Sequence, residues 1–216
     1  MLRFHSISTP FVLALLLVSA SEFVKAGPLE DGKAAYDNGD YSMALELFRP
    51  LAEQGNADAL HSIGVMYAEG QGVAQDYAEA MKWFRKAAEQ GNVAAQSILG
   101  ALYVSQGVAQ DYAEAMKWFR KAAEQGNADA LRSIGVMYAE GQGVTQDYAE
   151  AMKWLRKAGK QGNADAQHNI GAMYFKGLGV TQDYAEAAKW YSKAAEQGNA
   201  DAQEALKQLS SAPARP

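Results

Sequence analysis

The chain has 216 residues, a formal net charge of −5 and no cysteine. The acidic balance argues against nucleic-acid binding, which needs a basic surface, and the lack of cysteine excludes disulfides and thiolate-bound zinc. Apolar residues make up 49% of the chain and charged residues 21%, which is typical of a folded domain and not of a disordered chain.

The first 26 residues have the pattern of a secretory signal peptide. Arg3 precedes an apolar run over residues 11–18, and small residues at cleavage spacing end at Ala20 and at Ala26. Cleavage after Ala26 is favoured because it leaves a longer polar stretch behind the run, and cleavage after Ala20 is the alternative. The run is far shorter than the ~20 residues of a membrane span, which disfavours an uncleaved anchor. We therefore expect a periplasmic or secreted monomer with no membrane span after cleavage.

One sequence unit is repeated along the remainder of the chain. The string Gln-Gly-Asn begins at residues 54, 90, 125, 161 and 197, and Gly72–Asn92 is identical to Gly107–Asn127 over 21 residues. Identity of this length indicates duplication, and a period of about 35 residues is typical of helical solenoids.

The first half of a unit is predicted to be a helix, over Ala57–Glu69 in the first full unit. Asn56 is a good N-cap, and Gly70 can end the helix in a left-handed conformation. Apolar residues at i, i+3, i+4 and i+7 share one face: Leu60, Ile63, Gly64 and Tyr67. The glycine on this face allows a neighbouring helix to approach closely.

The second half of a unit is predicted to be a helix that starts at Asp76, with Glu79 completing a capping box. Its buried face consists of Tyr77, Ala80, Phe84 and Ala87. On its exposed face, Arg85 and Glu89 are expected to form an i,i+4 ion pair. Two helices cannot bury so much apolar surface alone, so successive pairs must stack.

These patterns divide the chain into residues 1–26 (signal peptide), 27–56 (an N-terminal helix pair), 57–199 (four repeats), 200–209 (a closing helix) and 210–216 (a tail expected to be disordered).

The repeated pattern resembles the Sel-one-like repeat (SLR), a subfamily of the tetratricopeptide (TPR) superfamily. It matches from Ala59 to Gly198 in four copies, with Ile63-Gly64, Gln75-Asp76-Tyr77 and Trp83-Phe84 in the first copy, whereas residues 27–56 look more like an ordinary TPR. The resemblance implies an all-α, right-handed α-α solenoid whose first helices line a concave groove, and an adaptor role in protein complexes. Leu155 and Gly159 replace an aromatic residue and an alanine of the sister units, which predicts a softer joint there.

Residues that differ between the units are the candidates for partner binding. Gly64, Tyr67 and their equivalents do not vary and are interpreted as packing residues. By resemblance to the TPR groove, the partner-binding candidates are Asp58, His61, Val65, Glu69, Ser97, Arg132, Val136, Glu140, His168, Phe175 and Lys176. The aspartates suit a basic or polar partner, or alternatively only the helix dipole, and Phe175 is either an anchor for the partner or a packing residue.

The sequence offers little for catalysis. His61 and His168 lie three units apart, so no metal site is expected, and we expect no cofactor. No Ser-x-x-Lys tetrad supports a β-lactamase-like or cell-wall hydrolase activity, which is one alternative function. Glycan binding by Trp83, Trp118, Trp154 and Trp190 is another, although their helical spacing favours core packing. The sequence therefore predicts a non-catalytic scaffold for a protein or peptide.

Overall fold

The computed structural model describes residues 27–105 and 111–211, and in these residues all regular structure is α-helical. The helices are α1 (Pro28–Asp37), α2 (Tyr41–Glu53), α3 (Ala57–Glu69), α4 (Tyr77–Glu89), α5 (Val93–Val104), α6 (Tyr112–Glu124), α7 (Ala128–Glu140), α8 (Tyr148–Lys160), α9 (Ala164–Lys176), α10 (Tyr184–Glu196) and α11 (Ala200–Ser211). The all-α solenoid prediction is confirmed. The signal-peptide prediction concerns residues that lie outside the described ranges.

The predicted caps set the helix ends. The Oδ1 atom of Asn56 accepts a hydrogen bond from the Ala59 amide at 2.9 Å, and Oδ1 of Asp76 accepts one from the Glu79 amide at 2.9 Å. Gly70 then ends α3 with a left-handed φ of 72°. The C-terminal helix α11 continues to Ser211, two residues into the segment expected to be a disordered tail.

Each pair is held together by a ring or branched side chain packed on a glycine. A Cβ atom placed on Gly64 would lie 2.7 Å from Phe84, and one on Gly100 would lie 2.5 Å from Phe119. Leu155 fills the same place in the third full unit. No other residue type leaves room for this approach, which explains why the glycine recurs in every pair.

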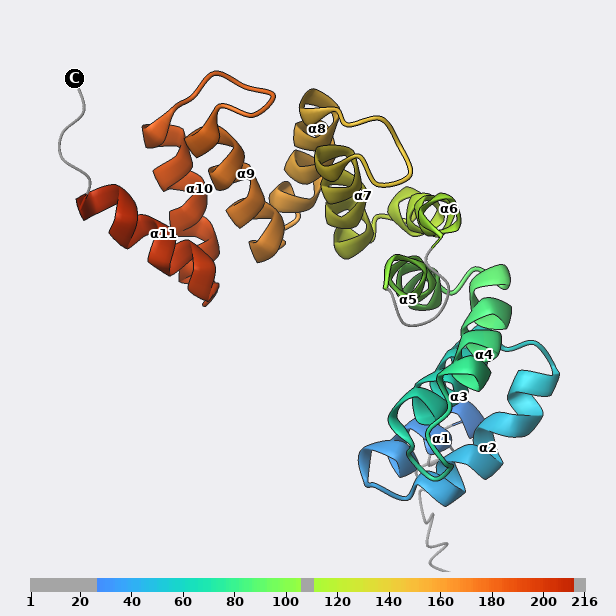
Figure 1. Ribbon diagram of the computed structural model, residues 1–216. Coiled ribbons are helices and arrows are strands. Elements are labelled where there is room, and N and C mark those ends of the chain that lie inside the picture. The colour runs from blue at the N-terminus through green and yellow to red at the C-terminus, as the bar shows by residue number, and fades with distance from the viewer. Residues whose placement is uncertain (1–26, 106–110, 212–216) are drawn as a thin grey trace, which may run out of the picture.

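The pairs stack into a curved arm (Figure 1). In the middle of the arm, α5 and α7 lie on the inner side of the arc, and α6 and α8 lie on the outer side (Figure 1). Only helices that are neighbours in sequence make extensive contacts, as in a solenoid.

Arginine–tyrosine hydrogen bonds join successive pairs. The guanidinium of Arg85 donates to the hydroxyl of Tyr103 in the next pair, and Arg120 donates to Tyr138 at 3.0 Å. Arg156 repeats the contact with Tyr174. The expected Arg85–Glu89 ion pair is therefore wrong, since the arginine is directed to the next pair. The ion pairs of the outer helices instead join a glutamate to the lysine three residues on, as in Glu79–Lys82 at 2.7 Å.

Asparagine–aspartate hydrogen bonds form a second link between pairs. The N-cap Asn92 donates through Nδ2 to Asp58 in the preceding pair at 2.9 Å, and Asn163 donates to Asp129 in the same way at 2.8 Å. Asn199 and Asp165 make the third such bond. The equivalent acceptor for Asn127 would be residue 94, which is alanine, so the α6–α7 joint lacks this link.

The second glycine of each Gly-x-Gly loop forms a third link. Gly143 has a φ of 68°, and a Cβ atom there would lie 2.6 Å from Cβ of Tyr112 in the preceding pair. Gly72 lies against Tyr41 and Gly179 against Tyr148 in the same manner. These glycines therefore do more than turn the chain, because they allow the loop to contact the helix start of the previous pair.

Two positions depart from the repeat in an instructive way. A Cβ atom on Gly159 would lie 2.9 Å from Cδ1 of Ile170, so the missing methyl group leaves no void. In α11, Lys207 occupies the position of the packed glycine in the earlier first helices. A further helix could not pack on α11 as α4 packs on α3.

Candidate functional site

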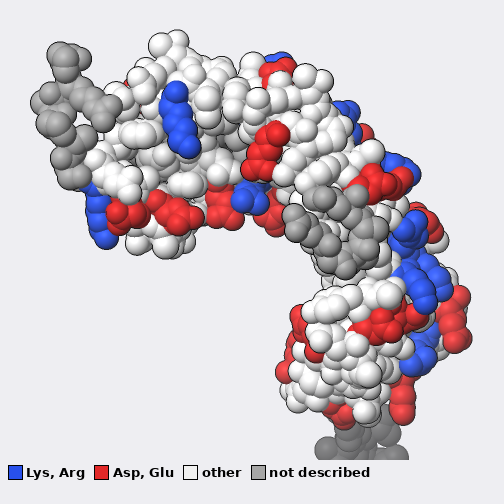
Figure 2. All heavy atoms as spheres, in the orientation of Figure 1, with Lys and Arg blue, Asp and Glu red and all other residues white. Residues whose placement is uncertain are grey.

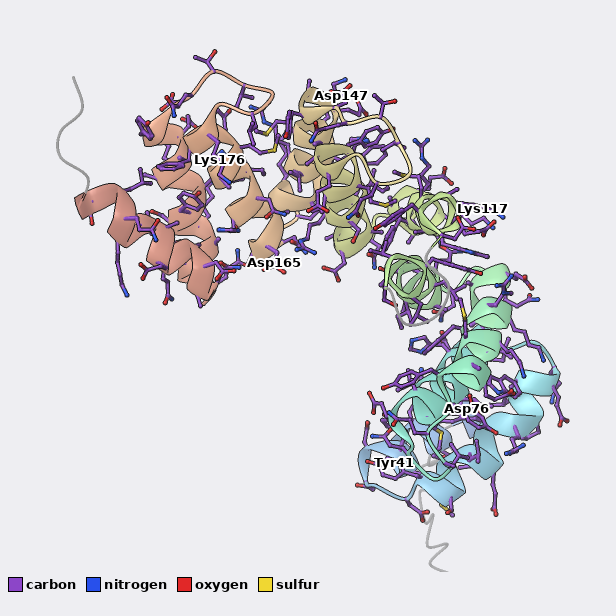
Figure 3. All side chains as sticks on the ribbon, viewed as in Figure 1. Tyr41, Asp76, Lys117, Asp147, Asp165 and Lys176 are labelled. Atoms are coloured by element: carbon purple, nitrogen blue, oxygen red, sulfur yellow. The ribbon has the colours of Figure 1, made fainter. Side chains whose placement is uncertain are left out.

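The inner surface is the set of residues on α1, α3, α5, α7 and α9 that face the hollow side of the arc. Acidic side chains form a row along the inner edge of the arm that contains α7–α11 (Figure 2). Asp165 lies at this edge, whereas Lys117 extends from the outer side (Figure 3). The inner surface carries two hollows among the described residues, and four of the predicted site residues line them.

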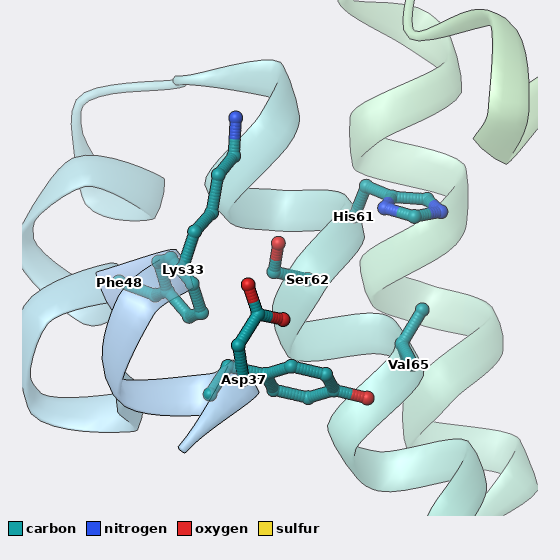
Figure 4. Close-up of a pocket in the computed structure, with 7 residues that line it drawn as sticks. Lys33, Asp37, Phe48, His61, Ser62 and Val65 are labelled. Atoms are coloured by element: carbon teal, nitrogen blue, oxygen red, sulfur yellow. The ribbon is translucent and has the colours of Figure 1, made fainter. Parts of the chain in front are cut away.

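The first hollow lies between α1 and α3 and has a volume of about 270 Å³. Its lining comprises Lys33, Tyr36, Asp37, Phe48, His61, Ser62 and Val65. The carboxylate of Asp37 is directed toward Ser62, while the Lys33 side chain extends away from both (Figure 4). The hollow therefore combines an apolar floor with an acceptor and a hydroxyl group.

His61 is partly withdrawn from solvent at the edge of this hollow. Its ring packs against Phe84 with a centroid separation of 5.8 Å. Burial lowers the pKa of His61, and the nearby Asp58 carboxylate opposes that shift. The imidazole is accordingly held in its neutral form near pH 7.

The second hollow lies between α5 and α7 and has a volume of about 190 Å³. Its lining comprises Ala101, Val104, Phe119, Arg132, Ser133, Val136, Met137 and Gln142. Arg132 is half-buried, and its Nε–H group is buried with no hydrogen-bond acceptor. A cation without a counter-ion thus lies beside an apolar depression.

The remaining predicted site residues do not line these two hollows. His168 packs on Tyr191 at 5.5 Å, and Phe175 packs edge-on against Tyr184 at 5.4 Å. Ser97 is half-buried and Lys176 is exposed. Glu69 accepts a hydrogen bond from the Tyr36 hydroxyl at 3.4 Å, and Glu140 accepts one from Gln142 at 2.6 Å.

The structure gives Asp58 and Phe175 roles that sequence reasoning left open or missed. Asp58, like Asp129 and Asp165, is the acceptor of an asparagine in the next pair, a role that neither of the two expected interpretations included. The 34-residue spacing of these pairs, repeated three times, is the signal that could have found them. For Phe175, the contact with Tyr184 supports the packing interpretation.

Each of the four repeated tryptophans has a lysine ammonium over its ring. Trp118 is buried, and the ammonium groups of Lys121 and Lys157 lie 4.3 Å from the ring centroids of Trp118 and Trp154 respectively. Lysines cover Trp83 and Trp190 in the same way, at 4.8 and 4.5 Å. In the part of the chain that the structure describes, no cluster of three or more metal-ligating residues occurs, and none of its helices is long and apolar enough to cross a membrane.

The sequence model of the Sel1 repeat family matches residues 29–56, 57–92, 93–127, 128–163 and 164–199. The first match covers the helix pair that was likened to an ordinary TPR. No curated protein shows significant similarity to the chain.

The solved structures that are similar to the chain include two at about 40% identity. A Sel1 repeat protein from Oxalobacter formigenes is 41% identical, with a TM-score of 0.78, over 83% of this chain and 74% of the other. A protective antigen of uropathogenic Escherichia coli with an SLR fold is 40% identical, with a TM-score of 0.77. That similarity covers 84% of this chain but only 40% of the antigen.

Proposed function

Because the chain belongs to the Sel1 repeat family, whose members are generally non-catalytic scaffolds for protein interactions, we propose that it is an extracytoplasmic scaffold that binds a protein or peptide on its inner surface. The role outside the cytoplasm is inferred from the N-terminal sequence pattern. The choice of the inner surface is inferred from where the units differ.

One comparison within the chain carries the proposal. Residues 57–73 and 128–144 are identical except that His61 in the first segment is Arg132 in the second. Both residues line hollows on the inner surface. The invariant residues pack between helices instead, as Gly64 does against Phe84. Between these two segments, the one difference therefore falls where a partner could be recognised, and the residues that pack between helices are the same.

Site-specific photo-crosslinking in cells tests this proposal. A photoreactive amino acid at Val65 or Val136 should capture a partner because both side chains line the hollows. The matched controls are Lys82 and Lys117, which are exposed on the outer helices. Equal labelling from inner and outer positions would contradict binding on the inner surface.

The extracytoplasmic location needs a separate measurement. We expect the periplasmic or secreted fraction to contain a chain that begins at Gly27, or at Ser21 if cleavage follows Ala20, and intact-mass analysis distinguishes the two. We also expect a monomer in sedimentation experiments. A chain that retains Met1 and stays in the cytoplasm would contradict the export proposal and leave the inner-surface proposal standing.

Catalysis is the competing function. The purified protein should not hydrolyse the chromogenic β-lactam nitrocefin or muropeptides. Turnover that is abolished by a single substitution on the inner surface, such as His61→Ser, would replace the scaffold proposal with an enzymatic one.

A further inference from the structure

Arg132 differs from three arginines of the outer helices. Arg85, Arg120 and Arg156 each donate to a tyrosine hydroxyl of the next pair. Arg132 has no such partner, and its buried Nε–H has no acceptor. A buried donor without an acceptor destabilises a protein, so the fold itself gains little from this arginine. The Nη groups of the same guanidinium are not among the buried atoms and can pair with an acceptor from outside the chain.

The acidic residues of the same helix are engaged elsewhere. Asp129, one turn before Arg132, accepts from Nδ2 of Asn163 at 2.8 Å. Glu140 accepts from Gln142 at 2.6 Å. The ion pairs of the described residues all join a glutamate of a second helix, or of α11, to a lysine three residues on. Arg132 is thus a groove cation without a carboxylate partner.

The neighbouring units show how this position is otherwise occupied. His61 packs on Phe84, and His168 packs on Tyr191. In the unit of Arg132, the residue equivalent to those rings is Leu155, which offers no aromatic face to the guanidinium. Among the described residues, Arg132 therefore has no ring contact of the kind that His61 and His168 make.

We infer that Arg132 pairs with the carboxylate of an aspartate or glutamate side chain in an extended segment of the partner, and that an adjacent apolar side chain of that segment occupies the second hollow. The edge formed by the two Nη groups of Arg132, which are not among its buried atoms, matches the two oxygens of a carboxylate. The apolar walls come from Val104, Phe119, Val136 and Met137. This inference rests on the proposed function and specifies the chemistry of its ligand.

The acidic group is assigned to a side chain within the segment and not to a chain terminus. The inner surface continues on both sides of Arg132, to the hollow between α1 and α3 in one direction and to α9 in the other. A segment bound along this surface extends past Arg132 on both sides, so the residue that contacts Arg132 lies within the segment and not at its end. Exposed acids elsewhere, including Asp58, Glu69 and Asp165, favour a segment that is otherwise neutral or basic.

Peptide display provides the test, because it works before the partner has been identified. The probes are two random dodecapeptide libraries, one embedded in a display protein and one with a free C-terminus. The wild-type protein, Arg132→His and Arg132→Glu are each used for selection. Arg132→His is the matched variant, since it gives α7 the sequence that already folds as α3. Circular dichroism and thermal unfolding verify that each variant is folded.

The wild-type protein should enrich an aspartate or glutamate beside an apolar residue in the embedded library. Arg132→Glu should instead enrich lysine or arginine at that place. A winning peptide should bind the Arg132→His variant about tenfold to a hundredfold more weakly at pH 8, where this histidine is mostly neutral. The peptide with asparagine in place of the acid should bind both proteins equally, as measured by fluorescence anisotropy.

Three outcomes would overturn the inference. Peptides of the same composition selected by the wild type and by Arg132→Glu would show that Arg132 does not read the charge, while the inner surface still binds peptides. Acid-dependent binding only in the free C-terminus library would assign the carboxylate to a chain terminus. If neither library binds the wild-type protein above the level of the display protein without a peptide insert, the proposed function fails as well.

Discussion

The α6–α7 joint and the α8–α9 joint are built from nearly the same sequence, but they are held by different bonds. At the α8–α9 joint, Asn163 donates to Asp129 at 2.8 Å and the buried Gln167 donates to the Gly159 carbonyl at 3.0 Å. At the α6–α7 joint both are missing, since Ala94 and Leu131 occupy those positions. A different side chain, Gln125, bridges to Gln96 at 2.9 Å.

The difference teaches that the packing within the pairs and the arginine–tyrosine bonds between them are common to both places, whereas the other polar links differ. Phe119 and Leu155 fill the same space on a glycine. The exposed asparagine–aspartate bond can be lost without loss of the fold, because its net contribution is small compared with that of a buried ring. We therefore expect ring packing to contribute most to stability and the exposed links to contribute least.

Phe119→Ala should have the largest effect and should lower the free energy of unfolding by about 3–5 kcal/mol, because it leaves a cavity against Gly100. Urea unfolding followed by circular dichroism measures it. The control Lys117→Ala, on the exposed face of the same helix, should change stability by less than about 0.5 kcal/mol. A loss below about 1 kcal/mol for Phe119→Ala would mean that this ring does not dominate the packing of α6 on α5.

Asp129→Ala should cost about 1 kcal/mol, because it removes the acceptor of Asn163 and a carboxylate from the first turn of α7. Asp129→Asn keeps an acceptor oxygen and should cost less than half as much. If the two substitutions are equally destabilising in urea, the charge and not the link between pairs is what matters.

Amide hydrogen exchange compares α8 with α6 directly. The lack of a side chain at position 159 leaves no void, because Ile170 fills the space beside Gly159. Lost packing at this position is therefore not a reason for α8 to be softer. The backbone cost of a glycine inside a helix remains and is about 0.5–1 kcal/mol. We therefore expect residues 151–160 to exchange a few-fold faster than residues 115–124, and equal protection would contradict this.

Ala94→Asp should supply the missing acceptor for Asn127 and stabilise the α6–α7 joint by about 0.5 kcal/mol. Residue 94 is exposed, so the larger side chain meets no packed atoms from the core. Ala94→Lys is the control because a lysine cannot accept a hydrogen bond. Stabilisation by both variants, or by neither, would show that an aspartate at position 94 does not stabilise the α6–α7 joint through a hydrogen bond to Asn127.

The smallest effect is the pH dependence that His61 gives to α3, since the equivalent residue in α7 is Arg132. Burial lowers the pKa of His61, so the unfolded chain binds a proton more readily than the folded chain does. The stabilisation is complete above about pH 6.5 and is lost as the pH falls. The fall in melting temperature between pH 7.5 and pH 5 should be smaller in His61→Ser than in the wild type. Equal falls would exclude His61 as a contributor.

Much of the fold could be predicted from the sequence because it depends on local spacing. The predicted helix over Ala57–Glu69 is α3, and Asp76 caps the second helix as expected. The glycine on the apolar face was interpreted correctly as a place of close approach. Caps, turn glycines and apolar periodicity are all properties of residues within one unit.

The links between pairs were missed because their partners lie 18 or 34 residues apart. Arg85 was assigned to Glu89 by helical spacing, but it donates to Tyr103. For the candidate site, the comparison of units found His61 and Arg132, both of which line hollows. It could not tell which of the varying residues lacked a partner, since that depends on the neighbouring pair.

Lys207 has a consequence for how an arm of this kind can change length. Lys207 occupies the position at which a glycine would allow an aromatic ring to pack, so a helix like α4 could not pack on α11 in the same way. The two identical 21-residue stretches lie in the interior, so an added or deleted copy there would leave the charged end untouched. Internal duplication would then lengthen the hollow side by one helix pair at a time without altering α11.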